Sequence, residues 1–454
     1  MLRDRLRPSA LLARFNGSRA ARGSFWTIFG FGATYAIRLL STLALTRLLT
    51  PDAFGLMSLA GVFLTGISML SDLGTSVSVI RSPRGDDPAY LRTAWSLQVI
   101  RGFGIAAVTC LIAWPVAEIY GQPVLFAVLC ALAFSPAIDG LRTISSATVQ
   151  RHQDLKWVTL IDISYQFSST LISVLAAWWL QSVWALVIGS NLASLARLLV
   201  GHLILPKFRH RFELEPEAMK DMVHFGRWIL LGTMLTYLGG QGNRAIFALM
   251  IPLDMLGLLT IAQTLSWALG QLIAKLLNQV ALPAMSRVMR ERPQDLPATA
   301  TRIKRMMFFY VTPCFIALSL FSQPLVDLLY DPRYAEVGTF VGMLALSGGI
   351  ATLAMPYQNA MLASGNSRGH ALVMGMGTVF RIALPVAMIW AFGLYGIFLG
   401  FFLGNLANYG ISYHFARKND YGTLAYDAIS ILVLSALFIW KWVEALQSGV
   451  MAAG

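Results

Sequence analysis

Residues 26–60 read WTIFGFGATYAIRLLSTLALTRLLTPDAFGLMSLA, and a similar stretch occurs at residues 228–262. In each copy an apolar segment leads to a short turn with Pro and Asp, and a second apolar segment follows. The identical pairs are Trp26/Trp228, Gly30/Gly232, Thr34/Thr236, Tyr35/Tyr237, Asp52/Asp254, Gly55/Gly257, Leu56/Leu258 and Ala60/Ala262. Two copies of one helical hairpin, half a chain apart, predict a membrane protein built from two similar bundles.

Composition places the chain in the membrane. Of its 454 residues 56% are hydrophobic and only 13% are charged, and the mean hydropathy is +0.63. Apolar runs of about 20 residues, enough to cross ~30 Å of hydrocarbon as a helix, recur from end to end. Backbone groups in lipid must be satisfied internally, and these runs are too long and too continuously apolar for barrel strands. We therefore expect an all-α polytopic membrane protein with two six-helix bundles related by a parallel repeat.

The expected organisation has five parts. These are a basic cytoplasmic arm (1–22), an N-terminal six-helix lobe (23–205), a polar cytoplasmic linker (206–222), a C-terminal six-helix lobe (223–416) and a C-terminal apolar helix with its tail (417–454). The expected helices cover about 25–48, 55–79, 94–115, 123–147, 157–179, 183–205, 224–249, 256–281, 306–326, 337–362, 370–391 and 394–415. A thirteenth apolar run, 425–442, either spans the membrane or lies at its interface.

The net charge of +13 does not indicate nucleic-acid binding, because the cations are distributed by side of the membrane. Most of the 35 Lys and Arg residues fall in loops on one predicted side, and only Arg47, Arg333 and Lys441 fall on the other. This is the positive-inside pattern, and it predicts a cytoplasmic N-terminus. The basic residues 1–22 are not followed by a small-residue cleavage site, so we expect a retained arm against anionic lipid.

Six basic residues lie inside expected helices, where a charge costs roughly 2.5–3.5 kcal/mol on insertion scales and so faces a cavity or a partner. They are Arg38, Arg101, Arg197, Arg244, Lys275 and Arg381. The acidic residues inside helices are fewer, namely Asp72, Asp139 and Asp162. Three carboxylates cannot balance six cations. At least two of the basic residues are therefore expected to line a cavity for an anion, with Arg197 the weakest candidate because it can snorkel to the surface.

Alternative partners exist for each carboxylate. Asp139 and Arg142 form an i,i+3 pair near the inner surface, and Asp162 is within reach of Arg142 or Lys156. Asp72 and Lys275 lie at similar depth in repeat-related helices, so they form a possible ion pair or coupling pair. Under this alternative the basic residues are neutralised by these carboxylates or by carbonyls, and no anion site exists.

Phosphate is the expected anion, because guanidinium groups bind its oxygens bidentately. The stretch Gly239-Gly240-Gln241-Gly242-Asn243-Arg244 is dense in glycine, which weakens a helix, and transporter sites often form where helices break. Gln241 and Asn243 would offer neutral hydrogen bonds to sugar hydroxyls. Asn405 and Asn408 are further candidates of this kind. The alternative is a close-packing kink without a ligand.

Other patterns indicate packing rather than chemistry. Gly396, Gly400 and Gly404 recur at four-residue spacing and predict close packing of their helix against a neighbour in the same bundle. The three cysteines, all in apolar segments, have no metal-site spacing and are interpreted as small buried hydrophobes. There is no Walker motif, so we expect no ATPase, and neither a metal nor a cofactor.

Five stretches together resemble the Wzx-type polysaccharide flippases of the multidrug/oligosaccharidyl-lipid/polysaccharide exporter superfamily, over roughly residues 22–420. The stretches are Ala44–Ala60 (ALTRLLTPDAFGLMSLA), Ser71–Ile80 (SDLGTSVSVI), Ala147–Asp154 (ATVQRHQD), Leu253–Leu265 and Asn278–Arg287 (NQVALPAMSR). The resemblance implies two six-helix lobes around a central cavity and alternating access. It also implies a polyprenyl-pyrophosphate-linked oligosaccharide as substrate, and a pyrophosphate role for Arg38, Arg244 and Arg381.

The resemblance further implies a multi-pass protein of the bacterial inner membrane that is not an enzyme. Its partners would be the lipid-linked substrate, membrane lipids and other polysaccharide-assembly proteins, without nucleic acid. The nearest alternative is a multidrug or cation antiporter of the same superfamily, which would need acidic groups in its cavity to bind cations. A membrane polymerase or ligase would need a large outer domain, and the longest expected outer loop, about 327–336, is too short for one.

Overall fold

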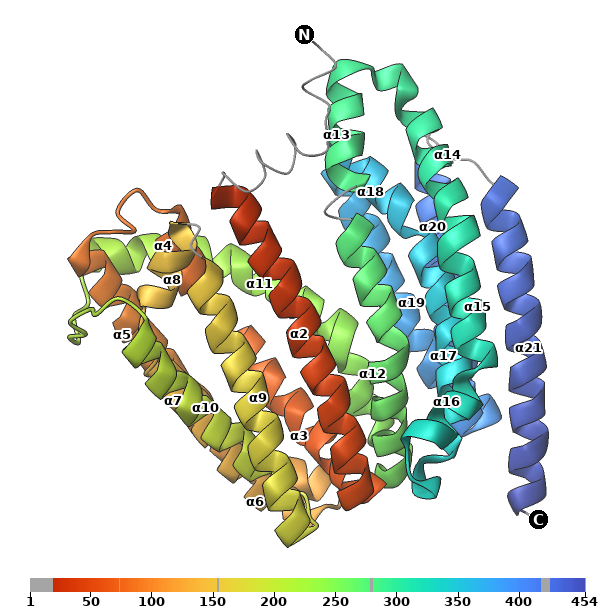
Figure 1. Cartoon of the computed structure of the whole chain (residues 1–454), viewed down its shortest axis with the longest axis horizontal. Helices are drawn as coiled ribbons and strands as arrows, with labels where there is room; N and C mark the ends of the chain where they lie inside the picture. Colours follow the sequence, from red (N-terminus) through yellow and green to blue (C-terminus); the bar gives the residue numbers. More distant parts are fainter. Residues whose placement is uncertain (1–18, 73, 153–154, 278–280, 418–424, 454) are drawn as a thin grey trace. The chain divides into compact units, whose positions relative to one another are not determined.

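The computed structural model describes residues 19–72, 74–152, 155–277, 281–417 and 425–453, and within them every regular element is a helix (Figure 1). Eleven helical segments of this described part are long and apolar enough to cross a membrane. The predicted fold class, an all-α polytopic membrane protein, is therefore confirmed. The six-plus-six repeat stays a prediction, and the basic arm lies mostly outside the described residues.

The chain forms two compact units. Unit 1 contains Met1–Leu49 and Leu59–Tyr237, and unit 2 contains Thr50–Ser58 and Leu238–Gly454. The chain therefore passes from one unit to the other inside two of its helices, α3 (Pro51–Leu70) and α11 (Pro216–Phe247).

Unit 1 is built from long helices that pack side by side. Helix α2 lies along α9, α9 lies along α10, and α5 packs against α6 and α7 (Figure 1). The bounds are α2 Arg19–Leu48, α4 Thr75–Arg81, α5 Pro88–Ile119, α6 Pro123–Leu132, α7 Phe134–Gly140, α8 Ser145–Arg151, α9 Leu155–Leu180 and α10 Trp184–Ile204. These helices supply the scaffold for the polar groups described below.

Two of the expected helices are interrupted within unit 1, so the prediction of continuous helices was wrong there. The expected helix 55–79 divides into α3 and α4, because Gly74 has a left-handed backbone (φ 59°) that a helix cannot contain. Asp72 stabilises the turn by accepting a hydrogen bond from the Gly74 N–H at 3.0 Å. The expected helix 123–147 divides into α6 and α7, which ends at Gly140. Gly74 and the end of α7 at Gly140 both line one cavity of unit 1.

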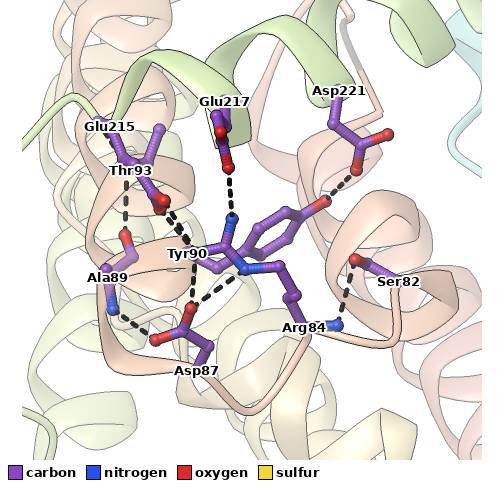
Figure 2. A network of polar contacts seen from close by, with 9 residues as sticks. All are labelled: Ser82, Arg84, Asp87, Ala89, Tyr90, Thr93, Glu215, Glu217 and Asp221. Atoms are coloured by element: carbon purple, nitrogen blue, oxygen red, sulfur yellow. Dashed lines mark hydrogen bonds and ion pairs between the residues drawn. The ribbon is translucent and has the colours of Figure 1, made fainter.

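The polar stretch 206–222 is non-helical to Glu215 and helical from Pro216, where α11 begins. Figure 2 shows how carboxylates of this stretch meet the loop before α5. The Arg84 guanidinium lies 2.6 Å from Asp87 and 2.8 Å from Glu215. Tyr90 donates to Asp221 at 3.0 Å, so the start of α11 also contacts α5. We call these contacts the Arg84 network, and they attach the stretch to unit 1.

Unit 2 is organised around α17 (Glu336–Leu353). In the helical segment Pro332–Ala363, 83% of the most apolar stretch of 18 residues is buried. The reason is that α17 is surrounded by α12, α15, α16, α20 and α21 (Figure 1). The remaining bounds are α12 Leu253–Leu276, α13 Leu282–Glu291, η3 Pro293–Asp295, α14 Leu296–Met306, η4 Met307–Val311, α15 Thr312–Leu320, α16 Ser322–Leu329, η5 Pro332–Tyr334, α18 Met355–Ala363, α19 Ser367–Phe392, α20 Leu394–Arg417 and α21 Ala425–Ala453. The expected helix 337–362 is thus interrupted at Ala354, between α17 and α18.

The two copies of the repeated stretch meet at their turns, inside unit 2. A Cβ atom on Gly55 would lie 1.9 Å from the Leu253 carbonyl oxygen, and one on Gly257 would lie 2.0 Å from that of Pro51. The Thr260 hydroxyl donates to the Ser58 hydroxyl at 3.0 Å. The two glycine contacts are equivalent to each other, because Gly55 corresponds to Gly257 and Pro51 to Leu253, and Ser58 corresponds to Thr260. Both glycines are therefore required for close backbone approach.

The three glycines of α20 pack as predicted, within one bundle. Cβ atoms on Gly396, Gly400 and Gly404 would approach backbone atoms of α19 at 2.0, 2.2 and 3.0 Å. By contrast, the cysteine prediction was wrong, because Cys110 and Cys314 are exposed on helix surfaces. Helix α21 has an apolar segment, Tyr426–Gln447, of 22 residues, which meets the length needed to cross a membrane.

Candidate functional site

Unit 1 contains a polar cavity of about 340 Å³ whose charges are balanced. Its two cations are Arg101 and Arg142, and its two carboxylates are Asp72 and Asp139. Arg101 lies 3.5 Å from Asp72, and its Nη2 donates to the Ser68 carbonyl at 2.7 Å. Asp72 lies in the turn after α3 rather than inside a helix, because of the interruption at Gly74. Among the described residues, the lining of this cavity therefore has no excess positive charge.

The second pair of this cavity lies at the end of α7. Arg142 is 3.9 Å from Asp139, the i,i+3 pair expected from the sequence. The side-chain amide of Gln98 donates to three backbone carbonyls here, those of Asp139, Gly140 and Arg142. These bonds satisfy acceptors that a helix end leaves without partners. This part of the cavity is consequently held by structural contacts.

Asp162 does not pair with Arg142 or Lys156, and this expectation was wrong. Its carboxylate lies 2.5 Å from Arg197 of the neighbouring α10, and the Arg197 guanidinium also faces the Tyr165 ring at 5.1 Å. The reason is geometric, because α9 and α10 pack along their length and bring Asp162 and Arg197 to the same level. Arg197 thus has a carboxylate and an aromatic face as partners.

Unit 2 contains a cavity of the same volume, about 340 Å³, with a different charge balance. Arg381 of α19 is its only charged lining residue among the residues that the structure describes. The Arg381 Nε donates to the carbonyl of Gly377 at 3.2 Å, and no described carboxylate lies within 4 Å of its guanidinium. Burial without a counter-charge is costly in a membrane helix, so this cation is the strongest anion-binding candidate in the described chain.

The other lining groups of this cavity are neutral and polar. Asn243 is 6% exposed, and its Oδ1 has no hydrogen-bond partner. Asn405 donates to the Ser347 hydroxyl at 2.9 Å. Further lining residues are Ser266, Trp267, Gln271, Phe315, Thr352 and Phe401. A cation with carboxamides, hydroxyls and aromatic faces around it suits a phosphate joined to a sugar.

Arg244 lies behind one wall of the cavity. Its guanidinium donates to Gln263 Oε1 at 3.0 Å from Nε and 2.8 Å from Nη2, and it faces the Trp267 ring at 5.5 Å. Trp267 itself lines the cavity. The positive charge of Arg244 is therefore close to the site, although Trp267 and Gln263 hold its side chain.

The remaining predicted residues are placed as follows. Arg38 lies in α2 with an exposed side chain and no described carboxylate within 4 Å, and Lys275 is half-buried in the last turn of α12. The prediction of a helix break at 239–242 was wrong, because α11 is a continuous helix through this stretch. Within lipid a helix keeps its backbone hydrogen bonds, since no water can replace them. Nothing is described of the Gln241 side chain.

The sequence interpretation missed a buried charge cluster in unit 2. Lys304 of α14 donates to the Asp427 carboxylate of α21, and both side chains are 1% exposed. The hydroxyls of Tyr357 and Tyr409 donate to the same oxygen of Asp427 at 2.8 and 2.7 Å. The sequence signal was an Asp at the start of an apolar run, but its partner lies 123 positions away. The cluster fixes α21 to unit 2.

Sequence comparison identifies the family. A profile described as "Polysaccharide biosynthesis protein" matches residues 44–338, more than half of the chain. The chain is 19% identical over 387 residues to the succinoglycan biosynthesis transport protein ExoT of Rhizobium meliloti (strain 1021), covering 83% of this chain and 77% of the relative. It is also 19% identical over 421 residues to an uncharacterized membrane protein in the cps region of Klebsiella pneumoniae, covering 91% of this chain and 85% of that one.

Solved structures share the fold. The lipid II flippase MurJ in an inward closed conformation matches with a TM-score of 0.66, at 10% identity over 95% of this chain and 99% of that one. An inward-facing multidrug resistance MATE transporter of the MOP superfamily matches with a TM-score of 0.56, at 12% identity over 85% and 94%. These likenesses and the profile agree with the resemblance found in the sequence. The chain belongs to the polysaccharide biosynthesis protein family.

Proposed function

We propose that this protein is a flippase that moves a polyprenyl-pyrophosphate-linked oligosaccharide from the inner to the outer leaflet of the bacterial inner membrane. It acts by alternating access, as a transporter rather than an enzyme, with its N-terminus in the cytoplasm. The transport serves exopolysaccharide, capsule or O-antigen assembly. Support comes from the family, from the likeness to a succinoglycan transport protein and from the fold of a lipid II flippase.

The proposed site is supported most directly by Arg381. This arginine of a membrane helix lines a polar cavity and has no described carboxylate partner. In the proposed complex its guanidinium binds phosphate oxygens, and the Asn243 and Asn405 carboxamides bind sugar hydroxyls. The Trp267 face offers an apolar surface to a sugar ring. Arg244 adds positive charge through the Trp267 wall.

The other sequence candidates have different parts in this proposal. Lys275 supplies a further cation for the pyrophosphate, and Arg38 and Gln241 stay candidates from the sequence alone. Arg101 is already paired with Asp72, so its role is to hold α5 against the turn before α4. Other polysaccharide-assembly proteins act as partners by delivering and consuming the lipid-linked sugar.

A drug or cation antiporter is the competing function, and the charge of the unit 2 cavity disfavours it. Cationic drugs and Na⁺ or H⁺ bind to carboxylates, whereas the described lining of this cavity has one arginine and no Asp or Glu. A resistance phenotype on overexpression would be the signature of that alternative.

The test is substrate exposure at the outer leaflet in the source bacterium after deletion of the chromosomal gene. Spheroplasts are treated with an enzyme that modifies the oligosaccharide from outside, and the modified fraction of lipid-linked sugar is measured. Wild-type protein should restore exposure, Arg381→Gln should lower it by at least about 10-fold, and Arg381→Lys should restore it in part. Flippase activity is disproved if wild-type protein leaves exposure unchanged.

The matched control removes a different membrane cation together with its carboxylate. The double variant Arg197→Gln/Asp162→Asn deletes an ion pair of unit 1 and should retain at least half of the wild-type exposure. The membrane content and the thermal unfolding of each variant show whether it folds. If Arg381→Gln folds and transports like wild type, Arg381 is not part of the site.

A further inference from the structure

A groove of about 470 Å³ opens where α14 meets the start of α21, apart from the cavity assigned to transport. Its described lining residues are Asp295, Ala298, Thr299, Thr301, Arg302, Arg305 and Tyr426. The groove lies in the first turns of Leu296–Leu320, a helical segment long and apolar enough to cross a membrane. All of these residues belong to unit 2, and α14 and α21 are in contact (Figure 1).

The two arginines of the groove are exposed, and no described carboxylate lies within 4 Å of either. They are three residues apart on a helix, which places them on one face about 5–6 Å apart at Cβ. This spacing lets two guanidinium groups hold the oxygens of one phosphate group. Asp295 also lines the groove, so the local charge is one net positive rather than two.

The opposite face of α14 anchors the helix firmly. Leu296 and Ala300 are buried in a core with Met285 of α13 and Ala360 of α18. One turn further, Lys304 is buried on Asp427 of α21. The positions of Arg302 and Arg305 are thus fixed by packing on the other side of their own helix, and the groove is preformed.

Below the arginines the same exposed face becomes apolar. Met306, Phe309 and Tyr310 are 56%, 59% and 71% exposed. Arg302, Arg305 and Met306 follow an i, i+3, i+4 pattern on one face of α14. Phe309 and Tyr310 lie in the π-helix η4 that continues this helix. On a membrane-spanning helix, such exposed large apolar side chains face acyl chains. A charged head region therefore continues directly into a surface for lipid tails.

We propose that this groove binds an anionic phospholipid, with Arg302 and Arg305 on its phosphate and its acyl chains along Met306, Phe309 and Tyr310. Basic pockets between membrane helices bind cardiolipin head groups by this chemistry. With the N-terminus in the cytoplasm, as proposed above, the lipid belongs to the inner leaflet. The phosphate of the transported polyprenyl lipid shares this chemistry and is the competing source.

The test measures lipid binding and does not depend on transport. The purified full-length protein in detergent is titrated with cardiolipin, and bound lipid is counted by native mass spectrometry. The double variant Arg302→Gln/Arg305→Gln should weaken cardiolipin binding about 10-fold, because two charge-assisted contacts are lost. Asp295→Asn should strengthen it, because the one groove carboxylate is removed.

The matched control is Arg287→Gln/Arg290→Gln, two exposed arginines of α13 outside the groove with the same loss of charge. It should change cardiolipin affinity less than about twofold if the groove rather than diffuse charge binds the lipid. Equal weakening by both double variants would overturn the proposal, as would equal binding of zwitterionic phosphatidylethanolamine. Tighter binding of polyprenyl phosphate than of cardiolipin would assign the groove to the substrate. An unchanged unfolding temperature shows that the variants fold.

Discussion

Unit 1 and unit 2 each contain a polar cavity of about 340 Å³, but the arginines that line the two cavities differ in their carboxylate partners. In unit 1, Arg101 and Arg142 have carboxylates within 4 Å. In unit 2, Arg381 faces only neutral groups among the described residues. A compensated arginine can be explained by stability alone, whereas an uncompensated one in a membrane helix points to a ligand that brings the negative charge.

Unit 2 nevertheless contains a cation with a carboxylate partner, at the point where α14 contacts α21. Lys304 and Asp427 are both 1% exposed, and two tyrosine hydroxyls satisfy the same carboxylate. The absence of a described counter-charge at Arg381 is therefore not a general property of unit 2. The difference between the two cations is position, because one joins helices and the other lines a cavity.

The largest expected effect comes from breaking the buried pair. Lys304→Met should destabilise the protein by about 3–5 kcal/mol, because it leaves the Asp427 carboxylate buried without a charge partner. Unfolding in detergent against a denaturant series measures this loss. The double variant Lys304→Met/Asp427→Asn should recover most of it. A double variant as unstable as the single one would show that packing, not charge, holds α21.

The second prediction adds a carboxylate to the cavity of unit 2, so that its arginine is compensated as the arginines of unit 1 are. Asn243→Asp places a carboxylate on the cavity that Arg381 lines, with almost no change in shape. Substrate exposure should fall on the order of 10-fold, since a unit charge several ångströms away is worth about 2 kcal/mol at an effective dielectric constant near 20. The neutral variant Asn243→Ser is the control. If both variants transport equally poorly, the amide group matters and the charge does not.

Hydropathy and local spacing predicted much of the fold. The apolar runs located the membrane helices, and the spacing of Gly396, Gly400 and Gly404 predicted the contact of α20 with α19. These features are local, so they can be read from one segment. The interruption at Gly74 was missed, because glycine in an apolar run signals either a packing contact or a turn.

The pairing of charges was the part that the sequence could not supply. Asp162 pairs with Arg197, 35 positions away, and Lys304 with Asp427, 123 positions away. Which cation meets which carboxylate depends on how helices are packed, and composition gives only the surplus of cations. That surplus predicts uncompensated arginines without naming them, whereas the structure places Arg381 on a cavity with no other charged residue in its described lining.

A smaller effect should come from the compensated pair of unit 1. Arg101 and Asp72 are 25% and 34% exposed, so a double-mutant cycle with Arg101→Gln and Asp72→Asn should give a coupling energy of about 0.5–1 kcal/mol. Transport by Arg101→Gln should stay within about twofold of wild type, because its charge is already balanced. A loss of transport as deep as that of Arg381→Gln would show that unit 1 also binds the anion, and the comparison between units would fail.

The smallest effect concerns the Arg84 network, where cations are compensated outside the membrane. The Arg84 guanidinium and the Ala89 N–H hold the pKa of Asp87 below its usual value. A lowered pKa means that the contact contributes stability above the unfolded pKa of about 3.9 and loses it as pH falls through the lower folded value. Hydrogen exchange of residues 206–215 should therefore be constant from pH 7 to about pH 5, after correction for intrinsic rates, and faster only below about pH 4.

Asp87→Asn should remove this acid dependence and expose the segment slightly at every pH, with Asp52→Asn as a control outside the network. An unchanged acid profile in Asp87→Asn would show that Glu215, not Asp87, carries the pH response of the network.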